Sequence, residues 1–447
     1  MLNQSITSHG GGAVAQYLRH WRALDLLRGG TFIAVFLLAW ITLDPFADLR
    51  ALPSKDLTGG NQTLTYFVFA LLLVLTVSLA ARDNMPALAS LITPGFVLFV
   101  GWIFLTVVFS LDPSTSIRRF ALTICAVAVA ATLMLLPRSQ DELVRWFSIA
   151  ALTLLVVCYL GLLLAPHLSI HLAADAREQE LAGNWRGSFG HKNLAATVMS
   201  MLLFLGIYIG RSGAWLSGVA IVSMTSLFLV HSGGKSSLTL CAAVLLVTST
   251  TSLIRSFWLR ALLLLAPLLV LNVLSVGSVI FTDLAQIAKL LPLDSTFTGR
   301  TDIWIFAVQA AQERLAMGYG FASFWGSSAI QNLPEGKEWA AFASHSHNGY
   351  LDMALQTGLP GLALLIWVLV INPLQNFHAA DRGGNNGPLA MALLRIWLFG
   401  LYLSSMESFF LDRANPSWFT FLFAVFGLHY LARFRVAESR TSRLTSS

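Results

Sequence analysis

Charged residues are scarce in this chain. They make up 11% of its 447 residues, whereas about 25% is usual for a soluble domain. Hydrophobic residues account for 56%, and the mean hydropathy is +0.70. This composition excludes an ordinary soluble protein and indicates a chain that lies mostly in a membrane.

Cysteine is also rare, and familiar nucleotide-binding motifs are missing. The three cysteines, Cys125, Cys158 and Cys241, fall inside apolar runs, which suits small core residues and not a disulfide or metal framework. The chain has no glycine-rich phosphate loop and no Walker-type lysine motif. No cofactor is therefore expected.

Apolar runs long enough to cross a bilayer, roughly 20 residues each, recur along the whole chain. They predict an all-α integral membrane protein with about twelve transmembrane helices, near residues 29–47, 63–81, 87–110, 119–136, 146–166, 194–210, 214–231, 236–253, 257–281, 350–374, 388–406 and 416–433. The first run is long enough to stay in the membrane, so a cleavable signal peptide is not expected.

The distribution of basic residues predicts how these spans are oriented. With the N-terminus inside, the cytoplasmic segments have a net charge of +8 and the opposite side −3, which favours N-in and C-in. The pI near 9.4 then reflects topology and not nucleic-acid binding. The predicted organisation is a cytoplasmic segment 1–28, nine spans within 29–281, a large periplasmic loop 282–349, three spans within 350–433 and a cytoplasmic tail 434–447.

Every notable polar cluster falls on the external side, which in a bacterium is the periplasm. The clusters lie in residues 167–193, 231–235, 282–349 and 407–415. Polar groups concentrated at a membrane surface usually mark chemistry or substrate binding. Because ATP is absent from the periplasm, any bond made there must draw on an activated substrate.

The loop before residue 194 holds three potential cations, Arg186, His191 and Lys192. They either contact lipid headgroups or form an anion site, because arginine binds phosphate oxygens in pairs and lysine adds a point charge. The helix predicted from about Leu194 would direct its positive N-terminal end at the same anion. Two interpretations also apply to Lys235, which either reaches to the membrane interface or binds an oxyanion beside exposed glycine N–H groups.

Arg300 precedes residues 302–316, where apolar positions recur at helical spacing. We predict an amphipathic helix on the membrane with Arg300 at its start. The alternative role for Arg300 is a structural ion pair with Asp294 or Asp302. The aromatic residues of 318–326 could stack on sugar rings, but anchoring at the membrane interface is favoured.

The most informative stretch is residues 344–352, which closes the long polar loop. A histidine near pH 7 can accept a proton from a hydroxyl group, so His347 is a candidate general base. The alternative is a solvated loop histidine, more so for His345 than for His347. A metal site is disfavoured because Asp352 is the only further ligand close in sequence.

Two more charged residues stand out. Glu407, in the last external turn, could orient His347 or bind the acceptor, but pairing with Arg413 is favoured. Arg395 is the clearest charge within a span, and its simplest role is to reach the cytoplasmic interface.

Together the chain offers several cations and one candidate base, without a pair of carboxylates. This set suits a pyrophosphate leaving group and a hydroxyl nucleophile, because cations stabilise the departing anion and the base takes the acceptor's proton. A polyprenyl-pyrophosphate-linked glycan fits the external location. The simplest hypothesis is a single metal-independent displacement with inversion at the anomeric carbon.

Over about residues 60–430 the chain resembles the O-antigen ligase and polysaccharide polymerase superfamily of bacterial membrane glycosyltransferases. The matching blocks are 186–193, 235–237, 299–304, 318–321, 347–352 and 358–362. The resemblance implies a GT-C-like fold with a large periplasmic loop in the bacterial inner membrane, and undecaprenyl-pyrophosphate-linked glycan as donor. The predicted site consists of a catalytic His347, donor-binding Arg186, Arg300, Lys235, His191 and Lys192, and supporting Asn348, Tyr350, Asp302 and Glu407, with no metal.

Within the superfamily, the blocks around Arg186 and Arg300 look most like exopolysaccharide polymerases of the succinoglycan type. Ligases that attach O-antigen to lipid A-core usually have arginine where this chain has Lys235, so a polymerase with a glycan acceptor is expected and a ligase is the alternative. The short tail after the last span counts against a protein O-oligosaccharyltransferase. A transporter of lipid-linked sugars is less favoured because the spans are nearly charge-free, and a non-catalytic scaffold is less favoured still.

Overall fold

The computed structural model describes residues 10–41, 45–50, 58–176, 178–281, 283–284, 286, 300–325, 330, 343–384, 387–413 and 415–437. These residues form helices, turns and loops. Extended backbone pairs in two isolated bridges among them, Ser139 with Ala437 and Ile170 with Trp185. The all-α prediction is therefore confirmed for the described part of the chain.

Helices follow the predicted apolar runs. In chain order they are α1 (Gly10–Ile41), α2 (Thr58–Asp83), α3 (Met85–Ser90), α4 (Pro94–Val108), α5 (Pro113–Leu133), α6 (Gln140–Leu164), α7 (Lys192–Arg211), α8 (Trp215–His231), α9 (Lys235–Ser249), α10 (Phe257–Asn272), α11 (Ser278–Ile280), α13 (Thr301–Glu313), α14 (Gly349–Leu365), α15 (Asn372–Arg382), α16 (Gly387–Leu403) and α17 (Pro416–Leu431). Short 3-10 segments are η2 (Pro166–Leu168), η3 (Gln179–Leu181) and η4 (Thr251–Leu253), and π-helical segments are η5 (Val273–Gly277) and η9 (Ile366–Ile371).

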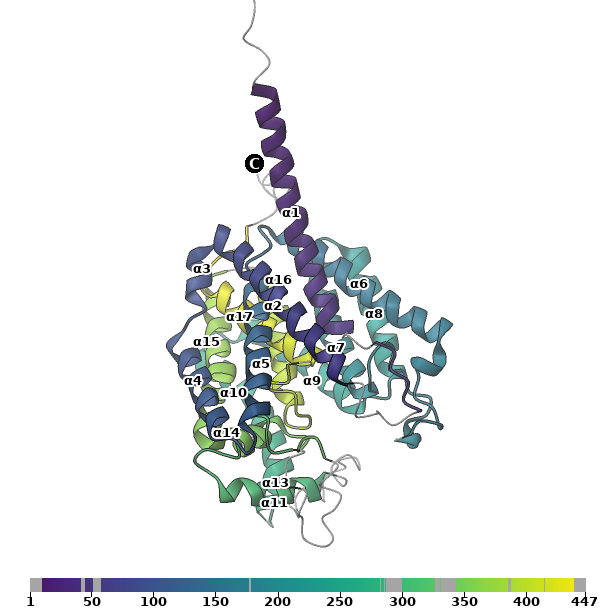
Figure 1. Cartoon of the computed structure of the whole chain (residues 1–447), viewed down its shortest axis with the longest axis vertical. Helices are drawn as coiled ribbons and strands as arrows, with labels where there is room; N and C mark the ends of the chain where they lie inside the picture. Colours follow the sequence, from purple (N-terminus) through teal and green to yellow (C-terminus); the bar gives the residue numbers. More distant parts are fainter. Residues whose placement is uncertain are drawn as a thin grey trace, which may run out of the picture.

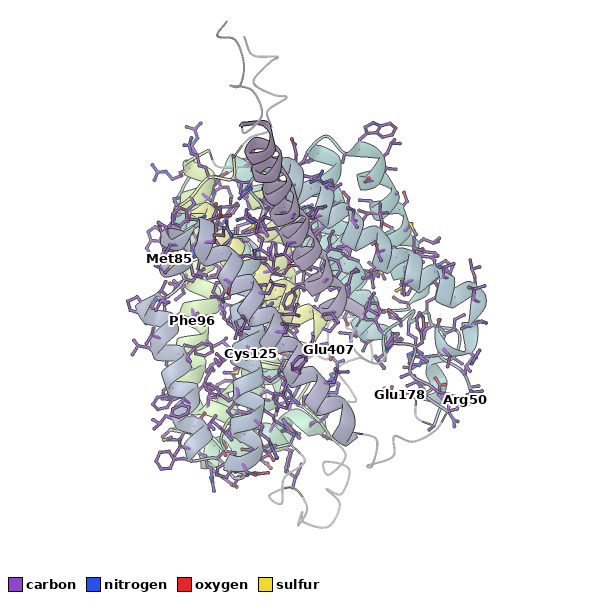
Figure 2. All side chains as sticks on the ribbon, turned by 45° about the horizontal axis from the view of Figure 1, so that its top comes forward. Arg50, Met85, Phe96, Cys125, Glu178 and Glu407 are labelled. Carbon is purple, nitrogen blue, oxygen red and sulfur yellow. The ribbon has the colours of Figure 1, made fainter. Side chains whose placement is uncertain are left out.

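Eight helical segments within the described residues are long and apolar enough to cross a membrane. Four shorter apolar helices, α4, α8, α16 and α17, correspond to the remaining predicted runs. Large apolar side chains also cover the outside of the bundle, as at Met85, which is 60% exposed (Figure 2). An apolar outer surface suits contact with lipid. Each predicted run thus contains a helix, while the number of true crossings stays a prediction.

Capping residues in the sequence set where several helices begin. Asp112, Ser139, His191, Asn348 and Asn415 each accept a hydrogen bond from a backbone N–H in the first turn of the following helix. Proline stands in the first turn of α4, α5 and α17, where its missing N–H costs nothing. His191 and Asn348 therefore fix the starts of α7 and α14, two of the helices that begin beside the candidate site.

The centre of the bundle is built from α7, α16 and α17. Helix α16 packs against α17, α7 and α9, and Trp397 in its middle is fully buried. Helix α8 lies close against α7 because both have glycine at the contact, and a Cβ on Gly218 would lie 2.4 Å from the Cα of Gly210. This packing holds the start of α7 in a fixed place relative to the end of α16.

Arg395 lies in α16 and is buried, with 8% of its side chain exposed. Its Nε donates a hydrogen bond to Thr248 Oγ1 of α9 at 3.1 Å. The residue therefore makes a contact between helices, and the expectation that it reaches the membrane interface is wrong. A polar contact of this kind ties neighbouring helices together inside a membrane.

The two ends of the bundle differ in character (Figure 1). The beginning of α1 lies at one end, and the bridge from Ala437 to Ser139 brings the C-terminal segment to the start of α6 at that same end. Helices α11 and α13 lie at the opposite end. This arrangement agrees with two termini on one side of a membrane and a large loop on the other. Which side faces the cytoplasm stays a prediction.

Candidate functional site

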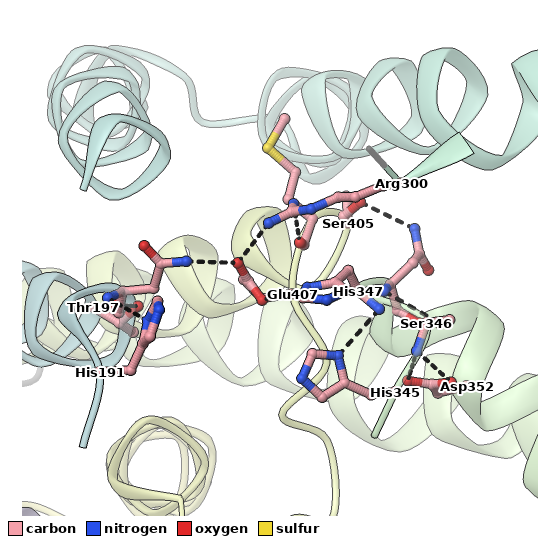
Figure 3. A network of polar contacts seen from close by, with 12 residues as sticks. His191, Thr197, Arg300, His345, Ser346, His347, Asp352, Ser405 and Glu407 are labelled. Atoms are coloured by element: carbon pink, nitrogen blue, oxygen red, sulfur yellow. Dashed lines mark hydrogen bonds and ion pairs between the residues drawn. The ribbon is translucent and has the colours of Figure 1, made fainter. Parts of the chain in front are cut away.

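Glu407 is the centre of a polar network that includes Arg300, the residue before α13 (Figure 3). Its Oε2 lies 3.2 Å from His347 Nδ1, and its Oε1 accepts hydrogen bonds from Arg300 Nη2 at 2.8 Å and Asn193 Nδ2 at 3.4 Å. Arg300 Nη1 also donates to the carbonyl of Met406 at 2.5 Å. Segments that are far apart in the sequence thus meet at one carboxylate.

The partners of Glu407 keep its side chain ionised. Burial by itself raises the pKa of a carboxyl group, but the hydrogen bond from His347 and the charge of Arg300 lower the pKa of Glu407 to about 2. An ionised carboxylate can only accept hydrogen bonds, so a neutral His347 has its proton on Nδ1. Its Nε2 then has a lone pair, and the side chain is 36% exposed. This is the arrangement that a general base requires.

His345 supports His347 and has the opposite tautomer. The backbone N–H of His347 donates to His345 Nδ1 at 3.3 Å, so a neutral His345 has its proton on Nε2. Burial, followed by the neighbouring His347, lowers the pKa of His345. The two rings lie 4.2 Å apart, and His347 has a φ of +56°, a strained value for this residue type. The loop is thus held in an uncommon conformation that exposes one imidazole.

Asn348 and Tyr350 fix this loop to the bundle. Asn348 is fully buried, caps α14 by accepting from Leu351 N at 2.9 Å, and donates to the Ser405 carbonyl at 3.0 Å. The hydroxyl of Tyr350 donates to the Leu401 carbonyl of α16 at 3.0 Å. Their supporting roles are therefore structural.

A cavity of about 260 Å³ lies beside Glu407 and is called the cationic cavity below. The first turns of α7 and α9 contribute to its wall, and helix N-termini favour anions. Lys192 Nζ donates to the carbonyl of Gly233, which has a φ of +61° in the turn before α9. The ionisable residues of the wall are Lys192, Lys235, Arg300, His191, Glu178 and Glu407. This geometry favours the oxyanion interpretation of Lys235.

A buried pair that the sequence analysis missed, His171 and Asp175, supports the loop before α7. His171 Nδ1 lies 3.2 Å from Asp175 Oδ2, and His171 Nε2 accepts a hydrogen bond from the backbone N–H of Lys192 at 3.2 Å. Burial, followed by the neighbouring His191, lowers the pKa of His171. The available signal was the spacing of four residues between a histidine and an aspartate in a polar loop. His191 itself lies 3.1 Å from Glu178, which lies nearer the edge of the molecule than Glu407 (Figure 2).

Arg186 lies outside the cationic cavity. It is 1% exposed, and its guanidinium donates to the carbonyls of Phe189 at 2.9 Å and Ala47 at 2.7 Å. A guanidinium that is buried and bound to backbone carbonyls is not placed to hold a pyrophosphate. These contacts favour a structural role for Arg186 in the loop before α7 over the expected donor-binding role.

Arg300 and Glu407 pair with each other, a contact that sequence proximity did not predict. The predicted amphipathic helix is present as α13, and its buried face includes Ile303, Trp304 and Ala307. Asp302 is exposed in the first turn of α13, while Asp294 lies outside the described residues. The favoured pairing of Glu407 with Arg413 is wrong, because both carboxylate oxygens face other groups.

The aromatic segment before residue 326 is part of the protein interior. Tyr319, Phe321 and Phe324 are at most 6% exposed, so the expected membrane anchoring is wrong for them. The Tyr319 hydroxyl donates to Glu313 Oε2 at 2.8 Å, and burial is the main cause that raises the pKa of Tyr319 to about 12. Trp325 is half-buried and donates from Nε1 to Asp352 Oδ1 at 2.9 Å.

Across the described residues, no group of three or more His, Cys, Asp or Glu side chains is arranged to hold a metal ion.

Two comparisons with known proteins show what this chain is similar to. Residues 220–366, which include Lys235, Arg300 and His347, match a family model described as O-antigen ligase. Over 215 residues the chain is 26% identical to the exopolysaccharide production protein ExoQ of Rhizobium meliloti (strain 1021). That match covers 44% of this chain and 48% of the relative, so it spans about half of the relative's length. The resemblance to the O-antigen ligase and polysaccharide polymerase superfamily is confirmed, with similarity to ExoQ within it.

Proposed function

We propose, from the superfamily resemblance and the site geometry, that this chain is a membrane glycosyltransferase. It moves a glycan from undecaprenyl pyrophosphate to an acceptor hydroxyl at the periplasmic face of the bacterial inner membrane. The observation that carries the proposal is the contact of Glu407 with both His347 and Arg300 beside the cationic cavity. A candidate base and a candidate leaving-group cation are thereby held by one side chain.

The pyrophosphate of the donor occupies the cationic cavity in this proposal. Arg300, Lys235 and Lys192 line that cavity, with His191 at the start of α7. A planar guanidinium binds two phosphate oxygens, and the ammonium groups add charge without a fixed geometry. The N-termini of α7 and α9 favour the same anion.

The reaction is a single displacement. The oxygen of the acceptor hydroxyl attacks the anomeric carbon, and the bond from that carbon to the pyrophosphate oxygen breaks. The hydroxyl proton passes to His347 Nε2, and Glu407 stabilises the resulting imidazolium. The leaving pyrophosphate keeps the electron pair of the broken bond, and the cations stabilise its charge.

Inversion and metal independence follow from the groups available for this step. Glu407 is already bound to His347 and Arg300, so it serves the base and not as a nucleophile that would form a glycosyl-enzyme. His347 supplies the base, and Arg300 with the lysines supplies positive charge at the leaving group. We therefore propose that no metal ion is required.

The favoured acceptor is another glycan, which makes the protein a polymerase of exopolysaccharide or O-antigen repeat units. The similarity to an exopolysaccharide production protein supports this choice. The match to the family model described as O-antigen ligase supports the alternative, transfer to lipid A-core. Transport of lipid-linked sugars is less well supported, because transporters place polar groups near the bilayer midplane, whereas this network includes Arg300 at the start of α13, at one end of the bundle (Figure 1).

The experiment is reconstitution of the purified protein with a native undecaprenyl-pyrophosphate-linked repeat unit, with His347→Ala beside it. A ladder of longer lipid-linked glycans that depends on His347 supports the polymerase. Transfer that occurs only after lipid A-core is added supports the ligase. If neither product forms, the proposal of glycosyl transfer is wrong and transport becomes the better hypothesis.

A further inference from the structure

A second cavity, of about 370 Å³, has His345 in its wall. Glu407 lines the cationic cavity, whereas the next residue, Ser408, lines the second one together with His345. Figure 3 shows the same order, with His191 on one side of Glu407 and His345 on the other. The candidate base His347 contacts one wall residue of each cavity, Glu407 of the cationic cavity and His345 of the second one.

We propose that this second cavity binds the sugar that carries the attacking hydroxyl, and we call it the acceptor cavity. The inference rests on the proposed function and assigns a place and a class of ligand to the acceptor. Inversion requires the attacking and leaving oxygens to lie on opposite faces of the anomeric carbon. Separate cavities for donor and acceptor, each with a wall residue in contact with His347, are compatible with this requirement.

The two cavities differ in the balance of charged side chains in their walls. This difference indicates which cavity suits a sugar and which suits a pyrophosphate. In the acceptor cavity, Arg119 and Arg413 are matched by Asp352 and Asp412. Arg119 is also bound to the carbonyl of Ala322. The cationic cavity instead has an arginine, two lysines and a histidine against two glutamates. A hydroxyl-rich ligand without a pyrophosphate suits the balanced cavity.

Trp325 gives the acceptor cavity a fixed aromatic wall. Its Nε1 donates to Asp352, which is buried and also accepts from Ser346 N at 3.1 Å. Phe324 packs edge-on against the indole, with ring centroids 5.0 Å apart. A ring held from two sides offers a flat apolar surface at little entropic cost, and such surfaces line small-molecule sites. One face of a sugar ring is apolar enough to lie on it.

The polar groups of this wall can bind hydroxyl groups. Gln356 Oε1 accepts from the backbone N–H of Ala322 at 2.8 Å, so its amide nitrogen is the group that can donate to a ligand. The Ser408 hydroxyl is buried and has no hydrogen-bond partner among the described residues. His345 has its proton on Nε2 and can donate beside the lone pair of His347. A buried polar atom at a cavity wall without a partner is a group that a ligand can satisfy.

The test uses the full-length protein in nanodiscs and the repeat-unit oligosaccharide released from its lipid carrier. Binding of the oligosaccharide is measured by calorimetry without donor, and transfer from the lipid-linked donor is measured separately. The variants are Trp325→Ala and Gln356→Glu, which keeps the oxygen that binds Ala322. Trp258→Ala is the matched control, because Trp258 is 78% exposed on α10.

We expect Trp325→Ala to raise the KM for the oligosaccharide about tenfold, with weaker binding to match, while the KM for the lipid-linked donor changes less than about twofold. Gln356→Glu changes the acceptor KM in the same direction, and Trp258→Ala behaves as the unmodified protein. The inference is overturned if both site variants leave the acceptor KM unchanged, or if the donor KM rises in parallel. If Trp325→Ala fails to fold, the acceptor KM of Gln356→Glu decides whether the inference stands.

The experiments give one result if the acceptor cavity does not bind the sugar and a different result if the protein does not transfer glycan. Oligosaccharide binding that Trp325→Ala weakens, without any transfer by the unmodified protein, supports the cavity and contradicts glycosyl transfer. Normal transfer and normal acceptor KM in both site variants contradicts the cavity and leaves glycosyl transfer standing. Absence of oligosaccharide binding by the unmodified protein overturns the cavity.

Discussion

His347 Nδ1 lies 3.2 Å from Glu407 Oε2, although 60 residues separate them in the chain. The same carboxylate binds Arg300 through its other oxygen. The group proposed to remove a proton and the group proposed to bind the leaving pyrophosphate are therefore both positioned by Glu407. Loss of this carboxylate should affect both halves of the reaction.

Glu407→Gln tests that relationship. We expect the transfer rate to fall at least about tenfold, because the amide no longer stabilises the imidazolium. The donor KM should also rise, since Arg300 loses its ionic partner. The measurement is steady-state transfer from the lipid-linked donor, with Glu180→Gln as the control at an exposed glutamate. An unchanged rate in Glu407→Gln would remove this residue from the catalytic arrangement.

The pH dependence of activity separates the carboxylate from the imidazole. The pKa of Glu407 is lowered from its ordinary value of 4.5 to about 2, so its contribution to stability is complete above pH 4.5 and is lost as the pH falls towards 2. Glu407 thus stays ionised from pH 8 to pH 5, and activity lost on acidification in that range reflects protonation of an imidazole. In Glu407→Gln we expect the midpoint of this loss to move to lower pH, because a charge that favours imidazolium is gone. An identical pH profile would contradict the proposed pairing.

Arg186 and Arg300 should respond differently to the same substitution. In Arg186→Met, the carbonyls of Phe189 and Ala47 lose their donor, which should cost about 1–3 kcal/mol of stability. In Arg300→Met the donor KM should rise and the thermal midpoint should change less. Both quantities are measured on the same purified samples. A raised donor KM in correctly folded Arg186→Met would restore the role that the sequence suggested for it.

The sequence predicted the helices well because each apolar run is long and several starts have a recognisable cap. It also identified Lys235, Arg300 and His347, since polar groups stand out in a chain with few charges. The pattern could not show which arginine is buried, because Arg186 and Arg300 have similar polar surroundings in sequence. Burial follows from the packing of the loop before α7 against distant segments.

The sequence-based predictions were wrong mainly where residues far apart in the chain pair with each other. Arg413 is six residues from Glu407 and was the closest arginine in sequence, whereas the observed partners His347 and Arg300 come from separate segments. The predicted membrane anchoring by aromatic residues within 319–325 was wrong for a related reason. Composition cannot distinguish a ring at a membrane surface from one that packs inside a folded loop.

Lys235 provides the sharpest test of the cationic cavity, because it begins α9 and faces the same space as the first turn of α7. We expect Lys235→Ala to raise the KM for the undecaprenyl-pyrophosphate-linked donor about tenfold, since the charge beside two helix N-termini is lost. Lys235→Arg should restore most of the affinity, because arginine keeps the charge and binds phosphate oxygens in pairs. The control is Arg211→Ala, which removes an exposed cation at the other end of α7. If Lys235→Ala and Arg211→Ala have the same donor KM, the positive charge of the cavity does not serve the donor and another surface must bind the pyrophosphate.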